Sequence, residues 1–317
     1  MLFHSSKKPV QLQIIHLNKV QKERIKALKS ASETDKKTLK KRLFKCSKDI
    51  VKLKKDDKHT DNARKVYVLD FDGDVKASAA HHLREEISTI ISSSTAGDEV
   101  VVRLESGGGQ VHAYGLAAAQ LARLKQAGLT LTVCVDKIAA SGGYMMACTA
   151  DKIIASDFAV IGSVGVVSQL PNFHELLKKH DIGYEMFTAG EYKRTVTMFG
   201  ENDDEDRAKY QSELNRIHEL FQTFVKTHRP SLDVASVATG EFWFGTDALS
   251  KGLIDEIGTS DAYLLALLDK HDVFVLHSRG KPTLAEKLGL AEQMSISELI
   301  KNAASGLSDT VAKLQRP

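Results

Sequence analysis

The sequence of 317 residues contains little cysteine, little proline and no long apolar run. Its three cysteines, Cys46, Cys134 and Cys148, are too few and too widely spaced to predict a disulfide framework or a zinc site. No window reaches the roughly 18 apolar residues that a membrane-spanning helix needs, and the N-terminus lacks the apolar core of a secretory signal. The chain as given is therefore expected not to span a membrane.

Basic residues are abundant but unevenly distributed. Residues 1–65 hold 20 Lys and Arg against 7 Asp and Glu, whereas the remainder holds 24 against 34. This asymmetry predicts a boundary near residue 65, between a basic segment and a mildly acidic domain. The composition, 42% hydrophobic and 27% charged, is otherwise that of a soluble globular protein whose length allows a substantial core.

The basic segment 1–65 contains a short apolar seam with 4-3-4-3 spacing, formed by Leu39, Leu43, Cys46, Ile50 and Leu53. Two heptads do not establish a coiled coil. The segment is interpreted as a solvated helical arm, a self-association helix or an arm lying on an anionic membrane surface. Because its only aromatics are Phe3 and Phe44 and it has no recognition motif, no nucleic-acid partner is expected.

From residue 66 onward, apolar runs of strand length alternate with amphipathic stretches. The pattern predicts strands at 66–71, 99–105, 129–136, 151–156, 159–167 and 184–189, and helices at 79–93, 113–128, 171–183 and 203–228. Such alternation predicts a layered α/β domain with parallel strands over residues 66–277. Residues 278–317 are expected to form a helical tail.

Two glycine-rich stretches stand out. In "ESGGGQ" (105–110), three glycines follow a predicted strand, where they let backbone N–H groups approach a ligand, but neither P-loop nor dinucleotide spacing is present. In "KIAASGGYMMACTA" (137–150), Ser141 precedes a predicted helix and is followed by two glycines. Ser141 is either a helix N-cap or a nucleophile, with the Gly142 N–H and a second N–H from the 107–109 turn facing an oxyanion.

A nucleophilic serine needs a base. His112, His174 and His180 lie in the domain, but none has a recognisable triad context. Lys193, in "TAGEYKRTVTMFG" (188–200), is either a surface loop residue or a general base, since desolvation favours the neutral amine. The residues alone are compatible with both interpretations of Lys193.

Seven stretches, in this order, carry a family resemblance: "RLESGGGQVHAYGLAAAQL", "VDKIAASGGYMMACTADKIIA", "IGSVGVV", "PNF", "TAGEYKRTVTMFGEN", "HRPSLDVASVATGEFWFG" and "KGLIDEI". Together they resemble the signal peptide peptidase A family of serine-lysine proteases, in particular its single-unit SohB-type members. The resemblance runs from Val66 to Leu276. It implies an α/β, ClpP/crotonase-like fold with repeated strand-strand-helix units.

The resemblance also implies residue roles. Ser141 falls on the family's nucleophile, Lys193 on its general base and Ser163 on the serine that orients the lysine amine. Gly109 and Gly142 fall on the oxyanion-hole positions. The family usually reads Ser-Pro-Gly-Gly at the first turn, whereas this chain has glycine at position 107. Losing that proline makes the turn less rigid.

Assembly and location are likewise implied by the resemblance. The family's single-unit members form homo-oligomers in which serine and lysine meet at subunit interfaces, and they are inner-membrane proteins whose catalytic side faces the periplasm. They have an N-terminal membrane segment before the basic stretch, and this chain has only the basic stretch, so a truncated or a soluble form is expected. The basic segment would favour contact with a membrane surface.

The expected activity is that of a serine endopeptidase acting on extended or unfolded, signal-peptide-like or membrane-associated peptides. No metal, nucleotide or organic cofactor is implied. Two alternatives are a catalytically silent, membrane-associated scaffold of the same fold and a crotonase-type acyl-CoA enzyme. The second would need a catalytic Glu or Asp where this chain has Ser141.

Overall fold

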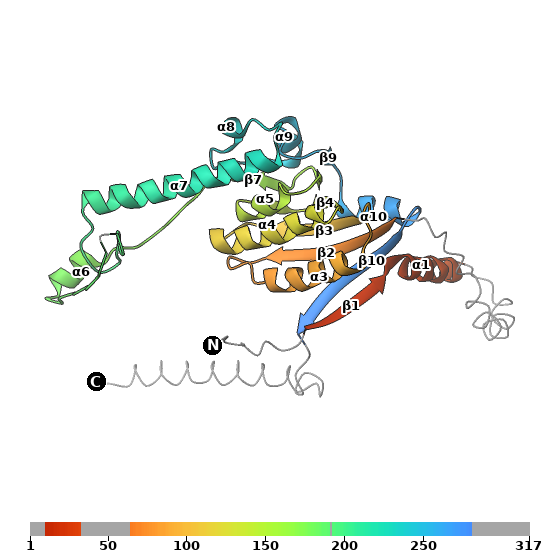
Figure 1. The fold of residues 1–317 in the computed structure, drawn as a ribbon, viewed down its shortest axis with the longest axis horizontal. Coiled ribbons are helices and arrows are strands. Elements are labelled where there is room, and N and C mark those ends of the chain that lie inside the picture. Colours follow the sequence, from red (N-terminus) through yellow and green to blue (C-terminus); the bar gives the residue numbers. More distant parts are fainter. Residues whose placement is uncertain (1–9, 33–63, 191, 281–317) are drawn as a thin grey trace. The chain divides into compact units, whose positions relative to one another are not determined.

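The structure is a computed structural model that describes residues 10–32, 64–190 and 192–280 (Figure 1). The heptad seam at 39–53 and most of the expected tail, residues 281–317, lie outside the described residues. The chain divides into two units, of which residues 14–277 form one and residues 1–13 with 278–317 form the other. The larger unit carries the predicted site residues.

A parallel sheet is the centre of the larger unit. Its strands follow the order β10 (Asp272–Gly280), β2 (Lys65–Gly73), β3 (Glu99–Ser106), β4 (Thr130–Val135), β6 (Lys152–Ala155) and β9 (Glu256–Ile257), with β1 (Val10–His16) beside β10. A branch continues from β3 through β5 (Ile138–Ala140) to β7 (Val160–Gly162), and β8 (Phe242–Phe244) pairs antiparallel with β7. The predicted parallel α/β architecture is confirmed.

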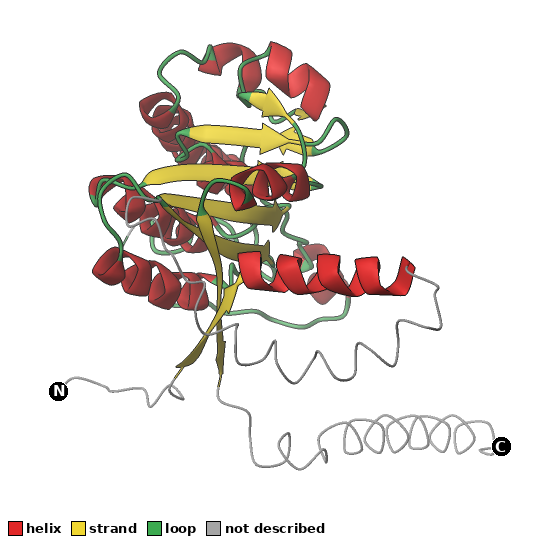
Figure 2. Ribbon diagram, turned by 90° about the vertical axis from the view of Figure 1, so that its right-hand side faces the viewer, coloured by secondary structure: helices red, strands yellow, loops and turns green. Residues whose placement is uncertain are grey.

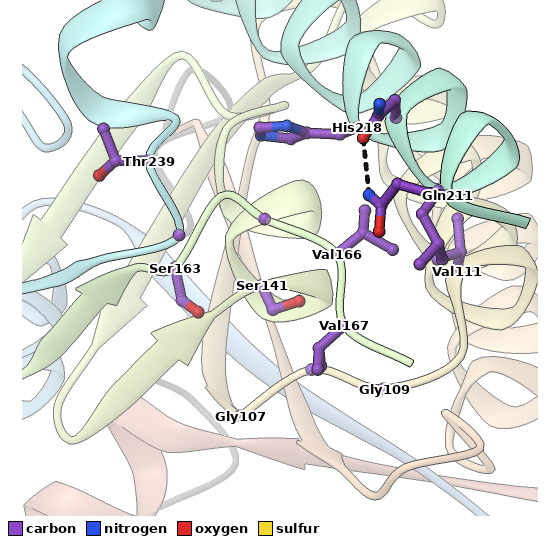
Figure 3. A pocket seen from close by; sticks show the side chains of 15 residues that line it. Gly107, Gly109, Val111, Ser141, Ser163, Val166, Val167, Gln211, His218 and Thr239 are labelled. Carbon is purple, nitrogen blue, oxygen red and sulfur yellow. Dashed lines mark hydrogen bonds between the residues drawn. The ribbon is translucent and has the colours of Figure 1, made fainter. Parts of the chain in front are cut away.

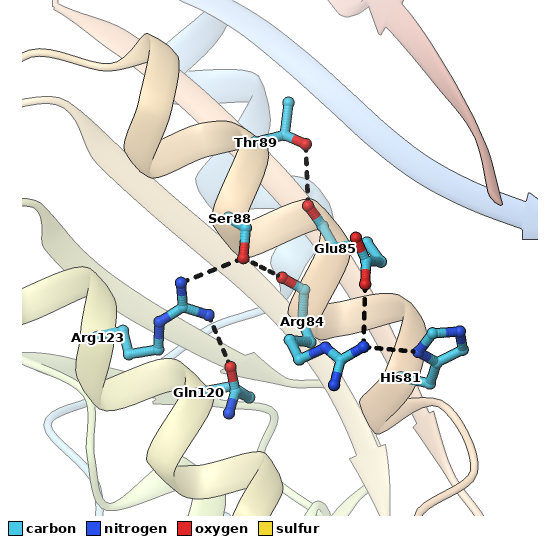
Figure 4. Close-up of polar contacts among 7 residues, drawn as sticks. All are labelled: His81, Arg84, Glu85, Ser88, Thr89, Gln120 and Arg123. Atoms are coloured by element: carbon cyan, nitrogen blue, oxygen red, sulfur yellow. Dashed lines mark hydrogen bonds and ion pairs between the residues drawn. The ribbon is translucent and has the colours of Figure 1, made fainter. Parts of the chain in front are cut away.

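Helices lie on both sides of this sheet (Figure 2). On one side, Val66, Val101 and Ile154, from three different strands, belong to one apolar cluster with Leu264 of α10 (Ser260–Leu268). On the other side lie α3 (Ala80–Ser93), α4 (Val111–Gln126) and α5 (Gly142–Ala147). Polar contacts add to the packing of α3 on α4, because Arg123 donates to the Ser88 hydroxyl at 3.1 Å (Figure 4).

The basic N-terminal segment includes part of the compact unit. Helix α1 (Leu17–Ser32) follows β1, and Ile15 and Leu17 pack against the apolar cluster under α10. The Asn18 side chain donates to the carbonyls of Leu268 and His271 at 3.0 and 2.9 Å. The expected boundary at residue 65 therefore marks a change of charge, whereas the compact unit begins at Ile14.

Among the described residues, four further helices belong to the segment between β7 and β9. These are α6 (His174–Lys179), α7 (Asp204–His228), α8 (Val234–Val237) and α9 (Gly245–Ser250). A capping box between Asp203 and Asp206 starts α7 where the sequence predicts it. The predicted strand at 184–189 is wrong, because these residues are exposed and irregular. Within the described ranges, no helix is both long and apolar enough to cross a membrane.

An ion pair attaches the end of α7 to the sheet. Arg229 donates to both carboxylate oxygens of Asp255, at 2.9 and 2.7 Å, and Asp255 accepts the N–H of Ile153 in β6 at 2.7 Å. Burial raises the pKa of Asp255, but the hydrogen bonds from Arg229 and Ile153 outweigh it and hold the pKa below its ordinary value. Protonation of Asp255 therefore weakens the attachment of α7.

We expect Asp255→Asn to lower the free energy of unfolding at pH 7 by about 1 kcal/mol. The loss is small because solvent partly screens the carboxylate. A depressed pKa gives stability that is present above the unfolded value of about 3.9 and is lost as the pH falls through the folded value. Urea unfolding should therefore show a smaller difference between wild type and variant at pH 3 than at pH 7. As a control, Glu219→Gln breaks an exposed pair with Arg216 and should change little. Equal differences at both pH values would contradict this account.

Candidate active site

Ser141 lies at the sharp turn between strand β5 and helix α5. Its backbone has φ 52° and ψ −118°, a left-handed φ that is strained for a residue with a side chain. The Ser141 N–H donates to the Gly162 carbonyl at 2.8 Å, and its carbonyl accepts from Met145 at 2.9 Å. The side chain makes no capping hydrogen bond. The N-cap interpretation therefore fails, although Ser141 occupies the capping position.

The glycine turn after β3 lies directly against Ser141. The sheet register places Ser106 opposite Ala139, so the chain leaves β3 and β5 side by side. At Gly108, φ is 88°, and an added Cβ would lie 2.7 Å from the Gly142 nitrogen and 2.8 Å from the Ser141 Cβ. A Cβ at Gly142 would overlap the Tyr114 ring. Glycine is needed at both positions for the two turns to approach.

Among the described residues, the backbone N–H groups of Gly109 and Gly142 have no acceptor at this junction. Within the described part of the chain, the N–H of Gly109 makes no hydrogen bond, whereas that of Gly108 donates to the Ser106 hydroxyl at 3.1 Å. Gly142 is the first residue of α5, so its N–H has no carbonyl partner within the helix. The two unbonded donors belong to the two glycines that the resemblance assigns to an oxyanion hole.

Ser163 follows β7 and is the second strained serine at the site. Its φ is 51°, its N–H donates to the Glu241 carbonyl at 2.7 Å and its carbonyl accepts from Gly165 at 2.9 Å. Because β7 pairs with β5, Ser163 and Ser141 leave neighbouring strands at the same edge of the sheet. Both serines lie on one cavity (Figure 3).

The cavity has a volume of about 640 Å³. Its wall is formed by the 107–109 turn, the 163–167 segment, one face of α7 and the residues before β8: Gly107, Gly108, Gly109, Val111, Ser141, Ser163, Gly165, Val166, Val167, Gln211, Leu214, Asn215, His218, Thr239 and Gly240. None of these described residues carries a carboxylate, an ammonium or a guanidinium. The cavity therefore offers an uncharged surface around the Ser141 hydroxyl.

Lys193 lies elsewhere in the chain. It is exposed and lines a second cavity, of about 690 Å³, together with apolar residues such as Met186, Phe187 and Val196. Figure 1 shows the neighbouring α6 at the far end of α7 from the sheet. The structure thus brings together Ser141, Ser163, Gly109 and Gly142, but a single chain does not bring Lys193 to them.

Helix α7 was not predicted to contribute to the site, but it forms part of the cavity wall. Gln211, Asn215 and His218 share one face of this helix, and the signal was their i, i+4, i+7 spacing. The His218 Nε2 lies 3.1 Å from the Val164 carbonyl and 3.2 Å from the side-chain nitrogen of Gln222. Among the described residues no group of three His, Cys, Asp or Glu side chains could hold a metal ion.

The fold and the site define an α/β protein with a serine at a strained strand-to-helix turn, and comparison with known proteins identifies its class. Residues 123–273 match Peptidase family S49 and residues 2–121 match Peptidase family S49 N-terminal. The chain therefore belongs to peptidase family S49, and its parallel α/β sheet agrees with the fold class that the family resemblance implies.

Curated relatives agree with this assignment. A protein of Haemophilus influenzae named "Probable protease SohB" is 53% identical over 250 residues, which cover 78% of this chain and 71% of the relative. The protein of the same name from Buchnera aphidicola subsp. Schlechtendalia chinensis is 51% identical over 272 residues, covering 83% and 89%. A solved structure of a mutant 1510-N membrane-bound stomatin-specific protease has a TM-score of 0.43 at 13% identity, covering 65% of this chain and 84% of that one.

We expect Gly108→Ala to lower kcat for hydrolysis of a labelled unfolded protein by about a hundredfold, the size of losing an oxyanion donor. The added methyl group must push Ser141 and Gly142 away from the turn. Gly97→Ala is the matched control, because Gly97 has φ 94° with nothing within 4 Å. It has similar backbone strain, about 1–2 kcal/mol, without the collision. Equal losses of activity in the two variants would show that strain alone is responsible.

Proposed function

We propose that this peptidase is a serine endopeptidase in which Ser141 is the nucleophile and Lys193 the general base. The observation that carries the proposal is the position of Ser141, at a strained turn on an open cavity beside two unbonded N–H groups. Strain of this kind clusters at active sites. Unbonded N–H groups beside a hydroxyl are the arrangement that acyl transfer needs.

In the proposed reaction, the Ser141 oxygen bonds to the peptide carbonyl carbon while the neutral Lys193 amine takes the proton of the Ser141 hydroxyl. The N–H groups of Gly109 and Gly142 stabilise the resulting oxyanion. As the C–N bond breaks, the lysine ammonium gives its proton to the leaving amine. Water, deprotonated by the same amine, then attacks the ester carbon. As the C–O bond to Ser141 breaks, the lysine ammonium returns this proton to the Ser141 oxygen and the acid is released. Ser163 would orient the amine.

We further propose that Lys193 reaches Ser141 from a neighbouring copy in a homo-oligomer. Lys193 lies outside the Ser141 cavity of its own chain, on a segment with many exposed apolar side chains: Leu170, Phe173, Leu176, Ile182, Tyr184, Met186, Phe187 and Phe199. An apolar surface of this extent is typical of protein interfaces. Covering it with a second copy would remove water from the amine, which favours its neutral form.

The substrates are proposed to be extended or unfolded peptides, of a signal-peptide-like or membrane-associated kind. The cavity wall consists largely of glycine backbone and the apolar side chains of Val111, Val166, Val167 and Leu214. A charged side chain of a substrate would find no counter-charge there and would lose its hydration. Cleavage is therefore expected beside small or apolar residues.

We expect Ser141→Ala and Lys193→Ala each to abolish peptide hydrolysis. If the two groups meet across an interface, mixing equal amounts of the two inactive proteins under subunit exchange should restore about a quarter of wild-type activity, because random closed assembly gives one interface in four with both groups intact. Hydrolysis of a fluorogenic peptide measures this. A mixture that stays inactive would exclude a shared site.

Two further variants sharpen this test. Lys178→Ala removes an exposed lysine of α6 and should leave activity unchanged. His218→Gln tests the titratable side chain that lines the cavity as a competing base. The His218 Nε2 lies against the Val164 carbonyl and Lys193 is the proposed base, so we expect this variant to keep part of the activity. Loss of all activity in His218→Gln, with Lys193→Ala active, would move the base to His218.

We also propose that the basic N-terminal segment contacts an anionic membrane surface. Helix α1 carries five basic residues and one acidic residue, and every residue from Lys22 to Ser30 is exposed. Ile25 and Leu28 are 44% and 73% exposed, so the helix presents apolar as well as basic groups. This combination is typical of helices that lie on lipid surfaces.

For this contact, the triple variant Lys22→Gln, Arg24→Gln, Lys26→Gln is expected to bind vesicles of phosphatidylcholine and phosphatidylglycerol about a hundredfold more weakly than wild type, since each basic group contributes about 1 kcal/mol. Co-sedimentation at low salt measures the affinity. The control Lys178→Gln, Lys179→Gln, Lys270→Gln has the same net charge and should bind like wild type. Equal weakening in both triple variants would show that net charge, not α1, determines binding.

A further inference from the structure

A buried chain of hydroxyl groups holds the glycine turn beside Ser141. The Gly108 N–H donates to the Ser106 Oγ at 3.1 Å, and that Oγ lies 2.6 Å from the Tyr114 Oη. The Tyr114 hydroxyl in turn donates to the Asp74 carbonyl at 2.7 Å. Tyr114 is 0% exposed and Ser106 is 2% exposed, so water does not compete for these bonds.

The acceptors at the two ends of this chain favour one direction for its bonds. The Asp74 carbonyl can only accept, so it takes the single proton of Tyr114. The Ser106 hydroxyl then donates to the Tyr114 oxygen at 2.6 Å, which is nearer than its other acceptor, the Gly73 carbonyl at 3.4 Å. Its lone pairs are left to accept the Gly108 N–H. Each hydroxyl donates one bond and accepts one, an arrangement in which the bonds strengthen one another.

The surrounding backbone is shaped for this pair of hydroxyls. A Cβ at Gly73 would lie 2.5 Å from the Ser106 Oγ and 2.6 Å from the Tyr114 Oη, so glycine at this position makes room for both. The Asp74 carboxylate accepts hydrogen bonds from the N–H groups of Lys76 and Ser78 at 3.1 and 2.8 Å. These bonds order the loop that supplies the terminal acceptor.

The hydroxyl chain engages one N–H of the turn and leaves the next one without a partner among the described residues. Because Gly108 donates inward to Ser106, the next N–H along the chain, that of Gly109, is left without a partner in the described structure. The sequence has no proline that would fix this turn. Resting on the proposed function, we infer that Ser106 and Tyr114 are positioning residues that hold the Gly109 N–H in place for the oxyanion.

Tyr114→Phe tests this inference by removing one oxygen. The ring would keep its packing against Gly142 and its edge-to-face contact with Phe71, whose centroid lies 6.4 Å away. We expect kcat for a fluorogenic peptide to fall about tenfold to a hundredfold, with KM changed by less than about twofold, because the oxyanion forms only in the transition state. Ser106→Ala should do the same, and the double variant should be no worse than either single one.

A second substitution distinguishes a role in positioning the turn from a role in stability alone. Gly107 has no left-handed φ, and an added Cβ there would meet only the Ile138 Cδ1, at 3.7 Å. Gly107→Pro should therefore fit and restrict the turn by a different means. We expect it to raise kcat of Tyr114→Phe about threefold or more, and to give wild type no comparable gain.

Tyr144→Phe is the matched control. Tyr144 is fully buried and donates one hydrogen bond to the Leu253 carbonyl at 2.9 Å, away from the turn. It should lose stability like Tyr114→Phe but keep the wild-type kcat. Equal kcat losses in the two tyrosine variants, or no difference in the effect of Gly107→Pro between the two backgrounds, would overturn the positioning role.

Labelling with a fluorophosphonate separates this inference from the proposed function. Ser141 of the wild type should be labelled rapidly, and Ser141 of Tyr114→Phe about tenfold more slowly, because the reagent also needs the oxyanion donors. A wild type that is not labelled at Ser141 would overturn the proposed nucleophile and the inference with it. Rapid labelling of both proteins, with equal kcat, would overturn the positioning role alone.

Discussion

The site depends on one constraint, the left-handed backbone of Ser141 between β5 and α5. A non-glycine residue in this conformation costs about 1–3 kcal/mol and persists only where its surroundings leave no alternative. Here the Gly162 carbonyl holds the Ser141 N–H, and the glycine turn fills the space beside it. The rigid ends of three neighbouring strands therefore position the hydroxyl, rather than a flexible loop.

The glycines of the site follow from this constraint. Gly108 and Gly142 let two turns meet at distances that side chains would prevent, and each turn leaves one N–H unbonded at the junction. Helix α7 covers the cavity from the other side, and the pair of Arg229 with Asp255 attaches its end to the sheet. The same geometry leaves Lys193 on an exposed apolar segment, so a single chain does not bring the proposed nucleophile and the proposed base together.

Part of this architecture could be predicted from the sequence. Long amphipathic stretches such as 79–93 and 203–228 were predicted correctly, because their apolar spacing reflects the faces they bury. Strand β5 was missed because three residues are too few to show a period. A strand was wrongly expected at 184–189 because an apolar run on an exposed surface resembles a buried one in sequence. The change in charge predicted a boundary near residue 65. The compact unit begins at Ile14, because Ile15 and Leu17 pack against the apolar cluster that includes Leu264 of α10. The role of α7 was not predicted, because the i, i+4, i+7 spacing of its polar residues is also that of an ordinary solvated helix face.

The most direct test is a crystal structure of the assembled protein with a peptide boronate bound. The account predicts a covalent bond from the Ser141 Oγ to boron, and one boronate oxygen within about 3 Å of the Gly109 and Gly142 nitrogens. It also predicts the Nζ of Lys193 from a neighbouring copy within about 3 Å of the Ser141 Oγ. A boronate bound elsewhere, or Lys193 facing solvent in every copy, would contradict it.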